Sequence, residues 1–311
     1  MYARAIPLIC RSNDVSLAAV PSTDQDRENQ VYPYHVWTSL KFIIVCSCAF
    51  LMLAAATAVR ADAIDSTENS SVDDLARASQ NPVAAMISVP FQNNLQILEN
   101  HSVLNALLIQ PVVPFKLNAD WNLVTRTIVP VLALSSPPSG FDKWGLGDIQ
   151  QSFFFSPDKP TSSGVIWGVG PVFSYPTASD TLYGSGKWSA GPGLVGLTMR
   201  GPWVIGMLLN NIWSFAGDSD RSRESFMSLQ PFVNYNMDGG WFLQSAPLIN
   251  ANWVAPSGEK WLVPIGGGGG RTFRIGAQAV TAILTGFYNV ERPTGGPEWN
   301  IRFQMTFLFP K

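Results

Sequence analysis

The C-terminal segment of the chain alternates between apolar and polar side chains over the eleven residues Trp299–Phe309. Its apolar positions are Trp299, Ile301, Phe303, Met305, Phe307 and Phe309, and its polar positions include Asn300, Arg302, Gln304 and Thr306. Successive side chains of a β-strand point to opposite faces, so the pattern predicts a strand with one wholly apolar face. Strands of soluble proteins usually have about five or six residues, whereas a tilted strand that crosses a bilayer has about 9–11. The segment therefore favours a membrane-spanning strand over a strand of a soluble sandwich.

The same period-two pattern recurs between about Ser88 and Phe309. The runs predict about twelve strands, beginning near Ser88, Val103, Trp121, Gly147, Val165, Lys187, Trp203, Ser225, Trp241, Lys260, Val280 and Trp299. Tight turns such as Asp238–Gly240 alternate along the chain with longer, charged loops such as Phe215–Glu224. Short turns at one end and longer loops at the other are typical of outer-membrane barrels. We therefore predict an all-β fold, a transmembrane outer-membrane β-barrel of about twelve antiparallel strands, located in the cell outer membrane of a Gram-negative bacterium.

Eight prolines lie inside the predicted strands, which leaves ten or fourteen strands open as alternatives. They are Pro111, Pro114, Pro130, Pro171, Pro192, Pro231, Pro247 and Pro264. Proline lacks the N–H that a strand ladder uses and is normally confined to edges or bulges. Because a closed barrel has no free edge, we expect bulges at these positions. The run Gly266–Gly270 fits a strand interior where backbones approach closely or where the barrel turns a corner.

The composition excludes several classes of protein. Only 14% of the residues are charged, whereas average soluble domains have about 25%. Intrinsic disorder needs the opposite balance of charged and aromatic residues. A multi-pass helical membrane protein is excluded because Phe42–Val59 is the only uncharged apolar run near the length of about 20 residues that a spanning helix needs. The net charge of -2 excludes the basic surface of a nucleic-acid-binding protein.

We interpret residues 1–63 as an N-terminal extension followed by a secretory signal peptide. Lys41 precedes the apolar run Phe42–Val59, and the small residues Ala61 and Ala63 mark two overlapping cleavage positions. An uncleaved membrane anchor is the alternative interpretation of the same run.

The remaining chain is divided into two parts. Residues 64–87 are expected to form a periplasmic lead-in that is flexible or contains a short helix near Val72–Ala78, and residues 88–311 are expected to form the barrel. Residues 1–35 carry charges of both signs, unlike the start of a signal peptide. We therefore hypothesise a mis-assigned start, with translation beginning near Val36.

Tryptophans gather near the predicted ends of the strands. The candidate interface belts are Trp121, Trp203 and Trp241 after short turns, and Trp188, Trp213, Trp253 and Trp299 near longer loops. An indole ring favours the membrane–water interface because it joins an apolar surface to a polar N–H group. We therefore expect these belts to contact outer-membrane lipid and lipopolysaccharide.

The polar face of the strands is expected to point into the barrel. The predicted lumen-lining residues are Arg126, Asn210, Gln230, Asn234, Asn236, Gln244, Asn250, Asn252, Arg302 and Gln304. An arginine on the lipid face is unfavourable by about 2–4 kcal/mol at the bilayer midplane, which favours the lumen for both arginines. Amides dominate the set, so we expect a narrow or side-chain-filled interior rather than a wide charged pore. The alternative is that these amides only satisfy one another structurally.

No catalytic, cofactor-binding or metal-binding site is predicted. His101 is the only histidine after the predicted signal peptide, and it lies in a predicted turn rather than beside a serine on one strand face, as nucleophilic catalysis would need. No cluster of histidine and cysteine offers transition-metal ligands. Asp218 and Asp220 are the candidates for calcium ligands, but a solvated loop is the preferred interpretation.

The last strand carries alternating aromatic residues, Phe307 and Phe309, close to the chain end. They resemble the signal that the barrel assembly machinery of the outer membrane reads, although Pro310-Lys311 displaces the usual terminal aromatic residue. We therefore expect Phe307 and Phe309 to serve in assembly, with that machinery as a partner.

Several motifs resemble one known family. They are Asn81–Ala84, Pro90–Asn94, Asp120–Thr127, Gly145–Ile149, Phe153–Pro157, Gly184–Gly191, Asn211–Gly217 and Phe232–Asn236. Over about residues 77–311 the chain is similar to the bacterial outer-membrane family labelled as proteins of the meta-pathway of phenol degradation, whose members are also called transporter or neuromedin U. The resemblance implies an outer-membrane barrel and the passage of small, partly hydrophobic molecules. It brings no catalytic residues.

The sequence therefore predicts an outer-membrane channel or transporter for passive passage of small compounds, with hydrophobic or aromatic ones favoured. The alternative is a non-conducting structural or receptor-like barrel, and an outer-membrane hydrolase is a distant third. No cofactor and no nucleic-acid partner is expected, and the sequence does not identify the solute.

N-terminal sequencing of the precursor tests the hypothesis of a mis-assigned start. We expect the precursor to begin near Val36, because the charges in residues 1–35 do not fit a signal peptide. A precursor with residues 1–35 intact would contradict the hypothesis.

Overall fold

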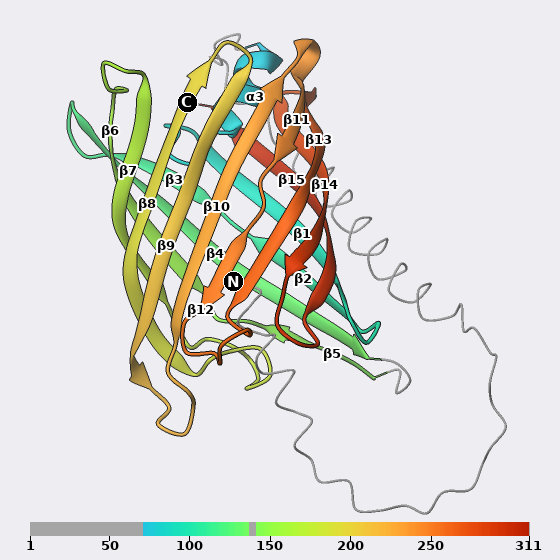
Figure 1. Ribbon diagram of the computed structural model, residues 1–311. Helices are drawn as coiled ribbons and strands as arrows, with labels where there is room; N and C mark the ends of the chain where they lie inside the picture. The colour runs from blue at the N-terminus through green and yellow to red at the C-terminus, as the bar shows by residue number, and fades with distance from the viewer. Residues whose placement is uncertain (1–70, 137–140, 311) are drawn as a thin grey trace, which may run out of the picture.

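The computed structural model describes residues 71–136 and 141–310, which form a closed barrel of antiparallel strands around one short helix (Figure 1). The expectations for the signal peptide, its cleavage and the translation start lie outside these residues. The strands are β1 (Ile87–Leu98), β2 (Val103–Ile109), β3 (Val112–Lys116), β4 (Trp121–Ser136), β5 (Phe141–Leu146), β6 (Gln150–Pro157), β7 (Val165–Ser174), β8 (Lys187–Arg200), β9 (Trp203–Gly217), β10 (Ser225–Asn236), β11 (Trp241–Ser245), β12 (Ile249–Asn252), β13 (Trp261–Ile275), β14 (Gln278–Glu291) and β15 (Pro297–Phe309). The helix is α3 (Val72–Ser79), and η4 (Asp238–Gly240) is a short 3-10 turn. No helix among the described residues is long and apolar enough to cross a membrane.

The fifteen strand segments make twelve barrel strands, because three pairs of segments continue one another. β2 and β3 keep one register against β1 and β4 on either side of Gln110 and Pro111. β11 and β12 keep one register against β10 and β13. β5 and β6 both pair with β4, with a small offset between them. The predicted all-β barrel of twelve antiparallel strands is confirmed.

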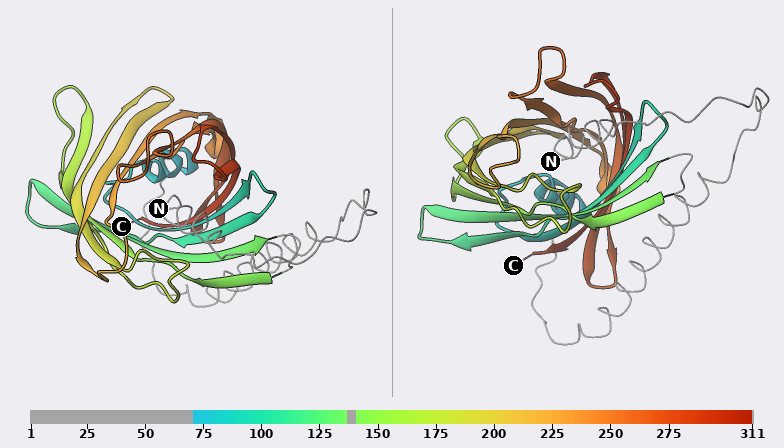
Figure 2. Two further views of the ribbon diagram at one scale, coloured as in Figure 1. Left: turned by 60° about the horizontal axis from the view of Figure 1, so that its bottom comes forward. Right: turned by 90° about the horizontal axis from the view of Figure 1, so that it is seen from below.

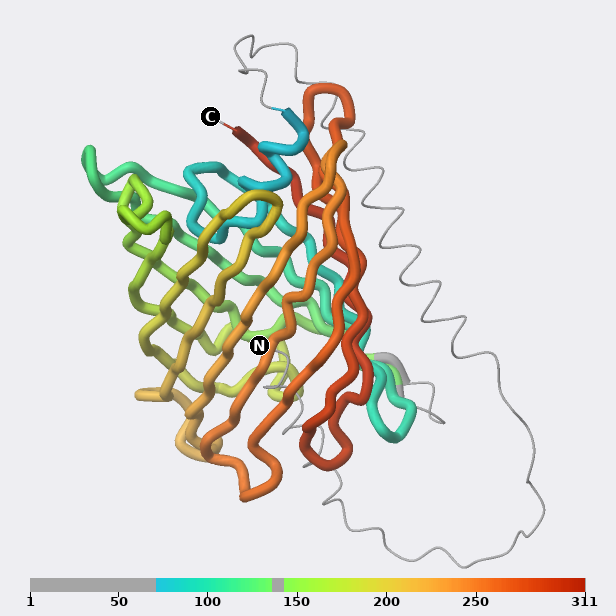
Figure 3. The backbone as a smooth tube through the Cα atoms, turned by 45° about the horizontal axis from the view of Figure 1, so that its top comes forward, coloured from blue at the N-terminus to red at the C-terminus, as the bar shows by residue number. Residues whose placement is uncertain are grey.

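The barrel closes between its first and last strands. β1 pairs with β15 from Ile87 opposite Phe309 to Leu98 opposite Pro297. β9 pairs with β10 and completes the ring, which the tube in Figure 3 makes visible. Each wall strand therefore has a neighbour on both sides, and the backbone amides and carbonyls of the wall bond to one another without water.

The predicted start of the fourth strand near Gly147 is wrong. The strand begins at Phe141 as β5, and β4 extends to Ser136, so both ends of the predicted loop Ser135–Trp144 belong to strands. The charged and glycine residues that suggested a loop pair with β4 instead, since cross-strand pairing outweighs a low strand propensity. Gly147–Ile149 then form a bulge between β5 and β6, with one residue more than the facing part of β4.

The prolines that lie inside the predicted strands are accommodated in three ways. Pro111 and Pro247 fall in the interruptions between β2 and β3 and between β11 and β12. Pro264 lies at a register shift between β13 and β14. Pro171 and Pro192 instead stand directly opposite each other in the continuous pair β7–β8. Interruptions and bulges are the expected response to the missing N–H group, but not every proline needs one.

The apolar faces predicted from the sequence point outward. In β15, Trp299, Ile301 and Phe303 are exposed, whereas Arg302 and Thr306 are buried inside the barrel. Large apolar side chains are exposed in the same way on β4, β7, β8, β9, β10, β13 and β14. An exposed apolar surface that extends over so many strands far exceeds what a soluble monomer shows, and lipid is its natural cover.

Helix α3 lies inside the ring of strands (Figure 2). Ser71 caps its first turn, because its hydroxyl accepts a hydrogen bond of 3.1 Å from the amide of Asp74. Leu75 is buried against Met86 and against side chains of β14 and β15. The sequence predicted a short helix in this region as one of two options, but it did not predict that the helix lies within the barrel.

Polar contacts attach this N-terminal segment, residues 71–86, to the turns at the short-turn end of the barrel. The contacting pairs are Asp73 with the amide of Gly240 (2.6 Å), Arg77 with the carbonyl of Gly201, and Gln80 with Asn236, whose amide groups exchange two hydrogen bonds of 2.8 and 3.1 Å. Val83 then reaches the apolar cluster formed by inward residues of β4, β6, β8, β9 and β10. The N-terminal segment thus spans the interior at this end.

Replacing Leu75 by Ala is expected to loosen α3 while the barrel stays folded. The side chain is 3% exposed, and truncation of a buried leucine typically destabilises packing by about 2–5 kcal/mol. Hydrogen exchange and protease cleavage should increase within residues 71–86 and stay unchanged in β14. Leu284→Ala is the matched control, because that leucine points outward and is 58% exposed. Unchanged protection of α3 in the Leu75 variant would show that this side chain does not hold the helix.

Candidate functional site

A cavity of about 160 Å³ lies inside the barrel beside the N-terminal segment. We call it the lumen cavity; residues 78–86 line one side, and β1, β3, β4, β9, β10, β11, β14 and β15 line the others. Six residues predicted to face the lumen line it, namely Arg126, Gln230, Asn234, Gln244, Arg302 and Gln304. Their positions follow from the alternation of the strands, because each lies on the polar face that the sequence assigned to the interior.

The other four predicted lumen residues lie outside the lumen cavity. Asn210 is buried on the inward face of β9. Asn236 is engaged with Gln80 at the short-turn end. Asn250 accepts a hydrogen bond of 2.8 Å from the hydroxyl of Ser228, on the neighbouring strand β10. Asn252 lies at the end of β12, where its side-chain oxygen accepts from a loop amide.

Arg126 faces the lumen cavity from the middle of β4. Its guanidinium donates to the side-chain oxygen of Gln110, which lies at the interruption between β2 and β3. Within residues 71–136 and 141–310, Arg126 forms no ion pair. The residues that line the cavity include no aspartate and no glutamate. The cavity therefore combines cationic and amide groups without an acidic side chain.

Arg302 is bound more closely to the wall. Its Nε donates to Asn94 Oδ1 at 3.1 Å, and its Nη1 donates to the carbonyl of Ala246 at 3.0 Å. The guanidinium also lies 4.9 Å from the ring centroid of Phe287, within the range of a cation–π contact. Ala246 lies between β11 and β12, so Arg302 reaches its carbonyl across β14 and β13. The arginine thus supplies a donor where the strand is interrupted.

The glycine run Gly266–Gly270 belongs to β13, one of the two strands that lie between Ala246 and Arg302. Gly268 stands opposite Thr285, which in turn stands opposite Arg302 in β15. A Cβ atom on Gly268 would lie 2.0 Å from the carbonyl oxygen of Leu284, closer than any real contact allows. The expectation that backbones approach closely at this run is confirmed.

The sequence prediction missed several residues of the lumen cavity. Gln92 and Gln110 line it from the first two strands, and Ser79, Gln80 and Met86 line it from the N-terminal segment. The alternation of β1 carries a signal for Gln92, because Gln92 shares a face with Asn94. No pattern marks the N-terminal residues, since their place depends on where α3 packs.

The long connection between β7 and β8, residues 175–186, folds over the interior at the opposite end. Tyr183 packs against Ala106, Leu108, Ile128 and Leu132 on the inward faces of β2 and β4. Burial raises the pKa of the Tyr183 phenol, and the nearby carboxylate of Asp180 adds to the effect. This end of the interior is therefore apolar and narrowed by the loop.

Asp148 holds the same loop in place. Its carboxylate is buried and accepts hydrogen bonds from the amide of Ser185 at 2.7 Å, the hydroxyl of Ser185 at 2.9 Å and the amide of Ala178 at 3.2 Å. Arg221 donates to the carbonyls of Thr181 and Gly184. The charged residues of the long loops thus bind the loops to one another, away from the lumen cavity.

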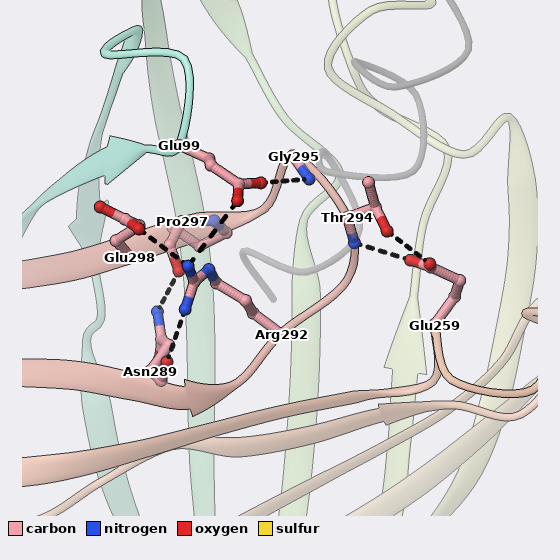
Figure 4. A network of polar contacts seen from close by, with 8 residues as sticks. All are labelled: Glu99, Glu259, Asn289, Arg292, Thr294, Gly295, Pro297 and Glu298. Carbon is pink, nitrogen blue, oxygen red and sulfur yellow. Dashed lines mark hydrogen bonds and ion pairs between the residues drawn. The ribbon is translucent and has the colours of Figure 1, made fainter.

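A second polar network joins three connections at the long-loop end (Figure 4). Thr294 donates to the carboxylate of Glu259 through its hydroxyl and its amide, both at 2.7 Å. Glu99 accepts from the amide of Gly295 at 3.0 Å. Arg292 forms an ion pair of 2.8 Å with Glu298. The turn between β14 and β15 is therefore fixed to the connections that follow β1 and β12.

The predicted belt tryptophans are exposed at the two ends of the strands. Trp121, Trp203 and Trp241 begin strands at the short-turn end, and Trp188, Trp213, Trp253 and Trp299 lie near the long loops. Several contact another aromatic ring edge to face, as Trp121 does with Trp167 at 5.9 Å. Phe309 is exposed at the end of β15, and Phe307 meets Phe91 at 6.0 Å.

The other sequence candidates form no chemical site. His101 occupies a turn with a positive φ of 62° and is exposed. Asp218 accepts a hydrogen bond from the backbone amide of Asp220, as in an ordinary loop turn. Within the described parts of the chain, no three histidine, cysteine, aspartate or glutamate side chains gather as metal ligands.

The Glu259–Thr294 contact is expected to open in acid. The hydrogen bonds from the Thr294 hydroxyl and amide lower the pKa of Glu259 below its usual value of 4.5. A lowered pKa in the folded state means that the contact is stabilising above the pKa that Glu259 has in the unfolded chain, and that this stabilisation is lost as the pH falls through the folded value.

Hydrogen exchange of the Thr294 amide, divided at each pH by the intrinsic rate of an unprotected amide, tests this, and the ratio should rise as the pH falls through the pKa of Glu259. Thr294→Val should raise the pH at which this protection is half lost toward the pKa of glutamate in an unfolded chain. Glu259→Gln should abolish the pH dependence of the protection. If Thr294→Val left that midpoint unchanged, the Thr294 hydroxyl would not be a cause of the lowered pKa of Glu259.

No family model matches the chain, and no curated protein matches it. Among solved structures, the chain is similar to an outer membrane channel from Pseudomonas putida F1, with 16% identity, a TM-score of 0.56 and coverage of 79% of this chain and 99% of that one. The NanC porin has 11% identity, a TM-score of 0.43 and coverage of 72% and 100%. The CymD monoaromatic hydrocarbon channel has 9% identity, a TM-score of 0.38 and coverage of 77% and 91%. The first likeness extends over nearly the whole of the compared chain, and with the closed twelve-stranded ring it establishes the fold of an outer-membrane β-barrel.

Proposed function

We propose that the protein is an outer-membrane channel for the passive passage of small, partly hydrophobic compounds. The observation that carries the proposal is the lumen cavity, enclosed by a barrel whose outer surface is apolar. A barrel that served only as a scaffold would have no need for an unfilled interior space lined by both polar and apolar side chains. The resemblance to the outer-membrane family of the meta-pathway of phenol degradation supports the same class of solute.

The lining of the lumen cavity favours solutes that are neither strongly charged nor fully apolar. Amides such as Gln230 and Gln304 alternate with apolar side chains such as Leu208, Phe232 and Ile283. The volume of about 160 Å³ is close to that of an engineered protein cavity of about 150 Å³ that holds one benzene molecule. A solute with a single aromatic ring therefore fits the space.

A non-conducting structural or receptor-like barrel is the second candidate. It is favoured by one observation: the N-terminal segment spans the interior at the short-turn end, and residues 175–186 narrow the other end. Passage of a solute the size of benzene then requires the N-terminal segment to shift. A scaffold would keep this segment fixed.

Planar-bilayer recordings of the purified full chain separate the two candidates. We expect discrete conductance steps, because the cavity is lined by groups that water and ions can contact. A cross-link between Gln80→Cys and Asn236→Cys, made with a short reducible reagent, should fix the N-terminal segment and reduce both the conductance and the uptake of phenol into vesicles. The described residues contain no cysteine, so the reaction is specific within them.

The control for the cross-link is the same double variant after treatment with reductant, which should regain the original conductance. A pair placed on the outer surface, Leu284→Cys with Phe303→Cys on adjacent strands, should have no effect when cross-linked. Silence of the unmodified chain in bilayers and in uptake would favour the scaffold.

Two further assignments belong to this proposal. The exposed tryptophans at both ends serve as interface belts against lipid and lipopolysaccharide. Phe307 and Phe309 serve as the signal for the barrel assembly machinery. The exposure of the tryptophans supports the first role. The second is supported by the place of Phe307 and Phe309 on one face of β15, beside the closing strand β1, where Phe309 is exposed.

A further inference from the structure

The lumen cavity contains a cationic side chain whose charge no acidic group in the lining balances. Arg126 faces the cavity and donates to a neutral amide oxygen, that of Gln110. It forms no ion pair within residues 71–136 and 141–310, and no carboxylate lines the cavity. A positive potential therefore extends into a space inside the barrel, where screening by water is weaker than on the outer surface.

The two arginines of the cavity differ in what they are engaged with. Arg302 bonds to Asn94 and to the carbonyl of Ala246 and lies over Phe287, which fixes its guanidinium to the wall. Arg126 has five N–H donors, and its contact with Gln110 leaves room for a ligand on the cavity side. A planar guanidinium matches a carboxylate with two parallel hydrogen bonds. Arg126 is therefore the better placed of the two to bind an anion.

Apolar side chains line the lumen cavity together with Arg126. They are Met86 of the N-terminal segment, Val112 of β3, Leu208 of β9, Phe232 of β10 and Ile283 of β14. A ligand at Arg126 thus meets a cationic group beside hydrocarbon, which is the complement of an amphiphile with an anionic head.

We propose that Arg126 is an anion-binding residue and that the preferred solutes are small carboxylates with an apolar body, such as an aromatic ring. This inference rests on the proposed function and narrows its substrate class. The cavity volume of about 160 Å³ limits the body to about one ring. Solutes with the same ring but no charge bind more weakly, because they leave the guanidinium without a counter-charge.

Binding of benzoate and of benzyl alcohol to the purified full chain tests the inference, because the two probes share a ring and differ in charge. Calorimetry should show benzoate binding at least about tenfold more tightly than benzyl alcohol, in keeping with a charge-assisted hydrogen bond. In Arg126→Gln the ratio of the two affinities should fall to about one. Arg126→Lys keeps the charge without the bidentate geometry, and it should give an intermediate ratio.

Arg200→Gln is the matched control, because it removes one positive charge from the exposed end of β8 and does not touch the cavity. It should leave the affinity ratio unchanged. Reversal potentials in a gradient of potassium chloride give a second readout: the unmodified channel should prefer chloride, and Arg126→Gln should lose that preference while Arg200→Gln keeps it.

The outcomes distinguish this inference from the proposed function. Conductance steps together with equal binding of benzoate and benzyl alcohol would overturn the anion site and leave the channel. Preferential benzoate binding that Arg126→Gln removes, in a chain without conductance, would support the site and refute the channel. If Arg126→Gln does not fold, the ratio in the unmodified chain and in Arg126→Lys still decides, since equal affinities in the unmodified chain would overturn the inference.

Discussion

The whole structure depends on one constraint: a backbone that crosses lipid must find all its hydrogen-bond partners within the protein. The ring closed between β1 and β15 meets this constraint for the regular parts of the wall. Where a strand is interrupted, other groups must supply the hydrogen bonds that the neighbouring strand does not. At the interruption that contains Pro247, Arg302 donates to the carbonyl of Ala246 across two intervening strands. A side chain that the sequence marks as a lumen residue therefore also completes the wall.

The interior follows from the same constraint, because charges excluded from the lipid face must lie in the lumen, in turns or in loops. Most acidic side chains are bound within loop networks, as Asp148 is by Ser185 and Glu259 is by Thr294. The lumen cavity keeps amides and arginines between two apolar clusters. The cavity is lined by polar and apolar side chains together, which suits solutes with both characters.

Much of the fold could be predicted from the sequence, because successive residues of a strand point to opposite faces of the sheet. Trp299–Phe309 alone separated the outer face from the inner one, and eleven of the twelve strand starts lie close to the observed ones. The fourth start was misplaced because Gly145, Gly147 and their charged neighbours have low strand propensity, while their pairing with β4 is decided across the hairpin. The position of α3 inside the ring gave no sequence signal, since an amphipathic helix of eight residues packs equally well on many surfaces.

The sequence by itself determined the class of fold, the outward and inward faces of the strands, and the confinement of charge to loops and lumen. These are local properties, fixed by the period of two and by the free energy of placing charge in lipid. Only the tertiary structure decided which inward residues share a space: Arg126 and Gln230 line one cavity, while Asn210 and Asn250 lie on the same face and do not. Which residues line the lumen cavity depends on the strand register, on the closure of the ring and on the N-terminal segment packed inside it. These features bring together residues that are far apart in the chain.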